Sequence, residues 1–267
     1  MTPEQVFQNE LEVFRTEAEA GTQFFYAYLT VHAVAAGDSQ VHRTLNSAPL
    51  FWNTTLGALQ TATFIVLGRV FDQDSPHNID KVLSISQRHP EIFGTAALAK
   101  RKQGSSKARP DWLDGYLESV YVPKASDFRR PRRYVREKRK IYDRSYRDLR
   151  RKVFAHRELS ERAAVEAHFA GTNIRELQRL FAFLNSFHET MWQLFLNGRK
   201  PNLRPRRYSV KRMRDFPSPE ERRKGVQERI VREAEAFLLA AARVAQPSVR
   251  PDRSIAVLRA SVERSGH

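Results

Sequence analysis

Apolar residues recur at intervals of three and four along most of the chain, and this spacing limits the fold more than any other feature. The strongest stripe runs from Leu177 to Phe195, between a capping box at 173–176 and a closing Asn197-Gly198 pair. Such spacing places the apolar side chains on one face of a helix, whereas the alternation typical of strands never persists. We therefore predict an all-α helical bundle.

Capping signals place the other helices. Thr2, Pro3 and Gln5 form the pattern of a capping box with proline at the first helical position, so a first helix should begin there and end at Gly37. Further helices are expected over 48–71, 79–87, 90–102, 112–117 and 218–245. The polar stretches 37–46 and 100–110 are expected to form turns or loops.

The chain is long enough to bury a sizeable core, and we divide it into three parts. Residues 1–201 should form the bundle, 202–216 a basic linker, and 217–267 a carboxy-terminal helical extension. A composition of 41% hydrophobic and 28% charged residues is typical of a soluble globular protein. No secretory signal and no run of about 20 apolar residues was recognised, so a cytoplasmic location and no membrane span are expected.

Positive charge is concentrated in one segment. Lys and Arg number 46 against 30 Asp and Glu, a net charge of +16, and the densest run of cations extends from 127 to 152. Such a run attracts polyanions, of which nucleic acid is the commonest. We predict a helix of about 25 residues from near Pro131 to His156 that follows RNA phosphates, although a merely solvated charged face would have the same pattern. The predicted RNA-binding residues are Arg136, Arg139, Lys140, Arg144, Arg147 and Lys152.

His156 ends this basic run and continues an apolar stripe through Tyr142, Tyr146, Leu149 and Val153. Imidazole can accept and return a proton near neutral pH, and neighbouring positive charge disfavours its protonated form.

A guanidinium complements that base, because it stays charged and its forked donors match phosphate oxygens. The combination indicates cleavage of a phosphodiester by an adjacent 2′-hydroxyl, a group that only RNA carries. With no cysteine and no paired histidine spacing, neither a metal site nor a cofactor is predicted.

The helical geometry argues for two chains at this site. At about 100° per residue, neither Arg150 nor Arg151 lies directly beneath His156, whereas Lys152 does. The helix must therefore end or loosen near His156, or a second copy must supply the arginine. We favour a homodimer with a composite active site.

The residues around His156 resemble a known family. The segment LRRKVFAHRE at 149–158, with FIVLGRVFDQDSPHNIDKVLSIS at 64–86, is similar to HEPN ribonucleases and most of all to their abortive-infection protein U subgroup. The resemblance covers roughly residues 2–201 and implies a HEPN-like helical bundle. It also implies that Arg150 is the family arginine, while Arg151 stands where asparagine is common.

The resemblance implies a toxin in phage defence or in a toxin–antitoxin pair, which would have a cognate antitoxin. A metal-independent endoribonuclease is accordingly the predicted function, with His156 as base and then acid. The alternative is a non-catalytic module that binds RNA or a partner protein through the basic helix. Attachment of that helix to anionic membranes is a weaker third possibility, because its apolar side is rich in tyrosine.

Overall fold

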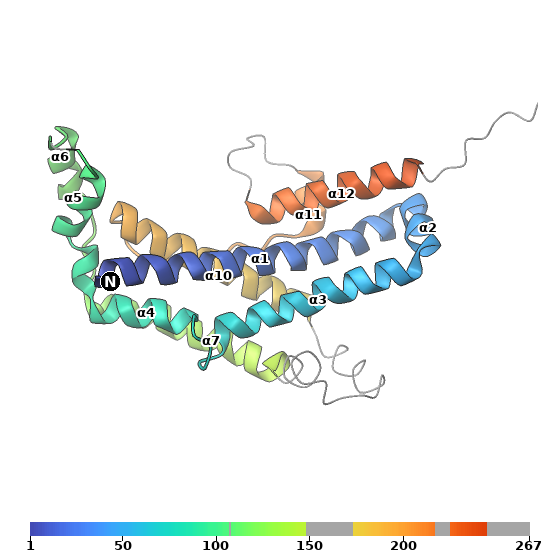
Figure 1. Cartoon of the computed structure of the whole chain (residues 1–267), viewed down its shortest axis with the longest axis horizontal. Coiled ribbons are helices and arrows are strands. Elements are labelled where there is room, and N and C mark those ends of the chain that lie inside the picture. Colours follow the sequence, from blue (N-terminus) through green and yellow to red (C-terminus); the bar gives the residue numbers. More distant parts are fainter. Residues whose placement is uncertain (107, 148–172, 217–224, 245–267) are drawn as a thin grey trace, which may run out of the picture.

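The computed structural model describes residues 1–106, 108–147, 173–216 and 225–244. Every regular element within these ranges is a helix, which confirms the predicted all-α class (Figure 1). Three long helices, α1, α3 and α10, form the centre of the bundle. Helix α12 covers α1 on the side opposite α3, and α5 and α6 project at the end that holds the amino terminus.

Helices α1 and α3 form an antiparallel pair. Helix α1 spans Pro3–Gly37, and the predicted capping box is present: Thr2 Oγ1 accepts from the Gln5 N–H at 3.3 Å, and Gln5 Oε1 accepts from the Thr2 N–H at 2.9 Å. Helix α3 spans Pro49–Phe71. The prediction of a turn or loop at 37–46, between these two helices, is wrong, because Asp38 caps a further helix, α2, at Ser39–Ser47.

Shorter elements follow α3. Helix α4 covers Ile79–Arg88, close to the predicted 79–87, and Asn78 is its cap. The 3-10 helix η1 at Pro90–Phe93 leads into α5 at Thr95–Gln103, which extends into the first residues of the predicted 100–110 loop. Helix α6 covers Trp112–Glu118, and the 3-10 helix η2 at Ala125–Phe128 leads directly into α7 at Arg129–Ser145.

The end of α7 corrects the predicted helix of about 25 residues. Tyr146 has φ −128° and ψ −23°, so regular helical geometry stops after Ser145. The apolar stripe nevertheless continues across the break, because Tyr142 and Tyr146 are both fully buried. Arg147 is helical again, so the helix is interrupted at Tyr146 while the apolar periodicity persists, and this is why the sequence alone suggested one uninterrupted element.

The carboxy-terminal half completes the core. Helix α10 spans Ile174–Asn197 between the Asn173 cap and Gly198, whose φ of 55° favours glycine. Helix α11, at Val210–Asp215, lies within the predicted linker, and α12 spans Val226–Val244. Leu238 of α12 joins a small buried cluster with side chains of α1 and α2. The boundaries proposed between bundle, linker and extension stay a prediction.

Aromatic side chains fill the main core. The rings of Phe25 on α1 and Phe181 on α10 stack with centroids 5.2 Å apart. Gly21 of α1 lies directly against side chains of α3 and α10, because a Cβ there would lie 2.7 Å from Phe181 and 2.8 Å from Val66. Only glycine leaves room for these two side chains.

Helix α3 is unusual in its surface. Among the helices in the described part of the chain, α3 is long and apolar enough by length and composition to cross a membrane, with a mean hydropathy of 1.2, whereas no membrane span is predicted above. Most residues of its second half, from Thr63 to Phe71, are buried in the bundle, with Arg69 as the exposed exception, whereas Leu50 and Phe51 in its first half are 82% and 62% exposed. A single helix of this kind is weak support for a membrane span, because core helices of soluble proteins share its composition.

Candidate functional site

The predicted catalytic residues Arg150, Arg151 and His156 lie outside the described residues, as does Lys152. The structure shows the two ends of the segment that contains them. The described chain stops at Arg147, just after α7, and resumes at Asn173, the cap of α10. The roles predicted for the four residues stay predictions.

Tyr146 joins the two ends of this segment. Its hydroxyl donates to the Asn173 carbonyl and accepts from the Asn173 N–H, both at 3.3 Å. Its ring stacks on Phe64 of α3 with centroids 5.6 Å apart, and burial raises its pKa to about 12. Two residues earlier, Arg144 bonds Glu176 of α10 at 2.6 Å. The base of the segment is therefore held against both α3 and α10.

Two cations at α7 and its end, Arg139 and Arg147, form ion pairs within the protein. Arg139 donates to Asp80 at 2.5 Å and to the Phe71 carbonyl at 3.0 Å, and its side chain is only 12% exposed. Arg147 contacts Asp143 at 2.8 Å and Asp72 at 3.5 Å. The Arg139–Asp80 pair holds α7 on α4, and the Arg147–Asp72 pair holds the residue just after α7 at the end of α3, whereas the Arg147–Asp143 pair is local. They leave less of Arg139 and Arg147 for a ligand than the sequence suggested.

Other cations of α7 point to solvent. We call Arg129, Arg132, Arg133 and Arg136 the arginine face, since their spacing of i, i+3, i+4 and i+7 places them on one side of the helix. They line a surface hollow of about 540 Å³ together with Gln73, Asp80, Ser84 and Arg139.

Little opposes the charge of the arginine face. Asp80 is already bonded to Arg139, and Glu137 lies 3.9 Å from Arg133 in an exposed pair. Arg136 and the nearby Lys140 are exposed and form no ion pair with any residue that the structure describes. The RNA-binding residues predicted from the sequence include Arg136 of this face but not Arg129, Arg132 or Arg133, although the helical spacing of the four is readable in the sequence.

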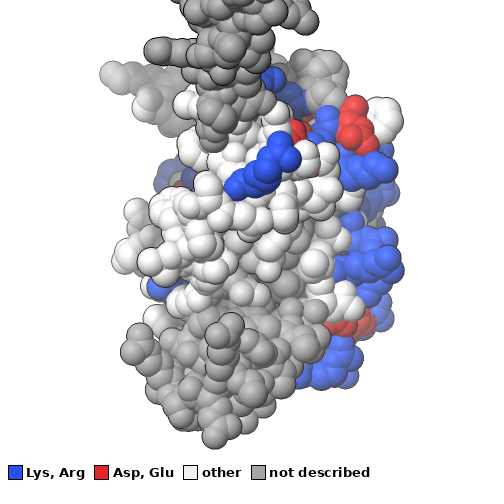
Figure 2. Space-filling view, turned by 90° about the vertical axis from the view of Figure 1, so that its right-hand side faces the viewer, with Lys and Arg blue, Asp and Glu red and all other residues white. Residues whose placement is uncertain are grey.

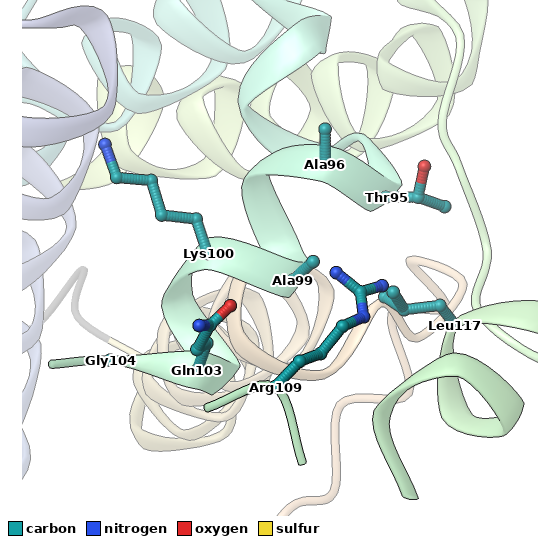
Figure 3. A pocket seen from close by; sticks show the side chains of 8 residues that line it. All are labelled: Thr95, Ala96, Ala99, Lys100, Gln103, Gly104, Arg109 and Leu117. Carbon is teal, nitrogen blue, oxygen red and sulfur yellow. The ribbon is translucent and has the colours of Figure 1, made fainter. Parts of the chain in front are cut away.

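A second hollow, of about 610 Å³, lies between α5 and α6 (Figure 3). Arg109 extends toward Leu117 in this view, while Lys100 points away on the other side. Arg109 is also bonded through its Nε to Asp114 at 3.1 Å. The cations of this hollow therefore do not converge on one point, in contrast to the arginine face.

The described histidine most removed from solvent is His188 on α10. Burial, with the nearby positive charge of Arg15, lowers its pKa to about 4. Its ring lies 6.0 Å from that of Trp192. His188 therefore stays neutral at physiological pH, as expected of a histidine that packs in the core. Within the described ranges, His, Asp and Glu form no group of three or more that could hold a metal ion.

Comparison with known proteins identifies the family. No curated protein and no solved structure matches the chain. The family model HEPN_AbiU2, described as AbiU2, matches residues 4–222, which include the helices α1 to α11 and the segment that carries Arg150 and His156. The resemblance predicted from residues 64–86 and 149–158 is thereby confirmed. The chain belongs to the HEPN AbiU2 family.

Proposed function

We propose that this protein is a metal-independent endoribonuclease that acts in phage defence or as the toxin of a toxin–antitoxin pair. One observation carries the proposal. The arginine face lies on the helix that leads into the segment with Arg150, Arg151 and His156, and Tyr146 holds the base of that segment on the bundle. Membership of the HEPN AbiU2 family supports the same class of activity.

The chemistry follows from the side chains. His156 takes the proton from a 2′-hydroxyl, whose oxygen attacks the adjacent phosphorus as the bond to the 5′-oxygen breaks. The same imidazole returns the proton to that leaving oxygen, so the products are a 2′,3′-cyclic phosphate and a 5′-hydroxyl. Arg150, or Arg151 in its place, stabilises the charge on the phosphoryl oxygens, a task commonly worth about 3 kcal/mol per donor.

The arginine face would bind the RNA backbone leading to this centre. Guanidinium groups that already have a carboxylate partner give less to a phosphate, so Arg129, Arg132, Arg133 and Arg136 should contribute more than Arg139 or Arg147. Lys140 and Arg144, which are exposed, extend the same helix toward Tyr146.

The active enzyme would be a homodimer. From residue 44 to residue 68 the chain has no charged residue, and the first half of α3 exposes Leu50 and Phe51. Figure 2 views the end of the bundle where this half lies, and the described part of that surface is largely uncharged apart from a cation near its centre and Lys and Arg along one side. Because the second half of α3 contacts Tyr146, a partner bound to the first half would lie near the catalytic segment. Sedimentation of Leu50→Asp and Phe51→Asp variants tests this surface.

Purified protein incubated with total RNA in EDTA tests the activity. The wild type should cleave, His156→Ala should not, and Arg150→Ala or Arg151→Ala identifies the catalytic arginine. Circular dichroism must show that each variant folds. A requirement for added divalent metal would contradict the mechanism. Under the alternative of a non-catalytic RNA-binding or protein-interaction module, His156→Ala would keep both its RNA affinity and any effect in cells.

A further inference from the structure

The described residues that follow α10, 198–216, form a second basic surface, away from α7. The backbone there is attached to the bundle at several points. The Arg204 N–H donates to Ser186 Oγ on α10 at 3.1 Å, and Tyr26 on α1 donates its hydroxyl to the Tyr208 carbonyl at 2.9 Å. This stretch, predicted as a linker, thus follows a defined path across the bundle.

Helix α11 continues that path and is attached to α12. Val210 and Met213 are buried, and Arg214 bonds Glu235 of α12 at 2.6 Å. Ser209 caps the helix by accepting from the Arg212 N–H at 3.0 Å. The backbone of this segment is therefore held in place, and its exposed side chains extend from defined Cα positions.

These side chains surround a hollow of about 610 Å³, which we call the linker pocket. Its lining consists of Arg206, Arg207, Tyr208, Ser209, Arg212, Met213, Phe216 and Glu228. The lining holds three arginines and one carboxylate, and Glu228 itself lies 3.5 Å from Arg232. The pocket therefore keeps an excess of positive charge.

Two features indicate the kind of ligand. Arg206, Arg207 and Arg212 are exposed and have no ion-pair partner in the part of the chain that the structure describes, whereas the neighbouring Arg214 has one. Phe216 is 77% exposed at the same pocket. Free guanidinium groups bind phosphates, and an exposed ring offers a surface on which a nucleobase can stack.

We propose that the linker pocket binds single-stranded RNA, with phosphates on Arg206, Arg207 and Arg212 and one unpaired base stacked on Phe216. Stacking requires a base that is free of a duplex, so a single strand fits better than a double helix. The proposal rests on RNA being the substrate class, and it adds a contact site outside both α7 and the catalytic segment. The pocket would bind a part of the substrate that is not itself cut.

The test is RNA binding by the full chain with His156→Ala, so that the RNA is not cleaved. Anisotropy of a labelled 12-nucleotide uridine strand gives the affinity at several salt concentrations. Adding Phe216→Ala should weaken binding about fivefold or more, while Phe216→Tyr should restore it. The matched control is Phe237→Ala, because Phe237 on α12 is also exposed, at 63%, but does not line the pocket.

Salt dependence isolates the arginines. Each phosphate contact to a single strand contributes about 0.7 to the slope of log affinity against log salt, so the Arg206, Arg207 and Arg212 triple alanine variant should reduce the slope by about 2. Arg243→Ala, which removes an exposed charge at the far end of α12, should leave the slope unchanged. The triple variant should also retain the circular dichroism spectrum of its parent.

Three results would overturn the proposal: a Phe216→Ala variant that binds as tightly as Phe237→Ala, a triple variant with an unchanged slope, or a parent chain that binds no strand. If Phe216→Ala lowered the affinity for single-stranded and duplex RNA equally, base stacking on Phe216 would be rejected as well. These outcomes are separate from the proposed ribonuclease activity, which fails only if the wild-type chain does not cleave RNA in EDTA.

Discussion

Replacing Tyr146 by phenylalanine removes one oxygen atom from the base of the catalytic segment and leaves the ring in place. The lost hydroxyl makes two hydrogen bonds to the Asn173 backbone, each at 3.3 Å, which is longer than the usual optimum. The Asn173 carbonyl keeps its bond from the Leu177 N–H at 3.0 Å, and Asn173 is exposed enough for water to reach its freed N–H. We therefore expect Tyr146→Phe to reduce the free energy of unfolding by about 1 kcal/mol.

Tyr146→Ala should cost far more, because it removes a fully buried ring that packs on Phe64. Loss of a buried aromatic side chain commonly costs about 3–5 kcal/mol. Urea unfolding followed by far-ultraviolet circular dichroism measures both variants. The matched control is Tyr134→Phe on α7, where the side chain is half-buried and the change should stay within about 0.5 kcal/mol.

The rate of RNA cleavage distinguishes whether the Tyr146 hydroxyl positions the catalytic segment or only stabilises the fold. If Tyr146 holds the segment in place, Tyr146→Phe should lower the cleavage rate at temperatures where the variant is fully folded, and Tyr134→Phe should not. A Tyr146→Phe variant with the stability and the cleavage rate of the wild type would refute the idea that this hydroxyl fixes the segment. A loss of stability with unchanged cleavage would show that the bond is purely structural.

Three further predictions address the core, pH and the cations of α7. Gly21→Ala should lower stability by about 1–3 kcal/mol in thermal unfolding, because its Cβ meets two core side chains, whereas Gly57→Ala, with open space around it, should raise stability by up to about 1 kcal/mol; equal effects would contradict the close approach at Gly21. The pKa of His188 is lowered to about 4 in the folded chain, so keeping this histidine neutral contributes about 3 kcal/mol to the free energy of unfolding above about pH 6.5, and this contribution is lost as the pH falls toward 4. Denaturation at several pH values should show this fall in stability, and His188→Gln should make stability less dependent on pH. Arg139→Ala should destabilise the protein by about 2–3 kcal/mol, and Arg136→Ala should leave stability unchanged while weakening RNA binding; the reverse pattern in unfolding and anisotropy measurements would contradict the division of the α7 cations.

The starts of the long helices could be predicted because local capping determines them. Thr2, Asn78 and Asn173 each bond backbone N–H groups within three residues, so the sequence contains the whole interaction. Asp38 acts in the same way, but α2 carries few apolar residues, and its polar sequence resembles a loop. Local signals therefore fail where composition suggests a turn.

The division of the α7 cations could not be predicted. Arg139 and Arg136 have similar sequence surroundings, yet only Arg139 meets Asp80, which comes from α4 much earlier in the chain. The break at Tyr146 was hidden for a related reason, since the ring remains buried on Phe64 and the apolar periodicity continues. Such contacts depend on how distant helices pack, which no local pattern contains.

The placement of α12 along α1 affects how the chain can fold during synthesis. Translation produces α1 long before α10 and α12, which pack on it. Phe25 stacks on Phe181 of α10, and Val34 is buried in a cluster with Leu238 of α12. Until α10 and α12 have left the ribosome, the apolar side chains of α1 that these helices cover lack that part of their native cover, although α3 can already pack on α1, and such exposed surfaces promote aggregation. Interrupted translation would therefore yield fragments that need chaperones or degradation, so a cell would obtain the compact molecule only from nearly complete chains.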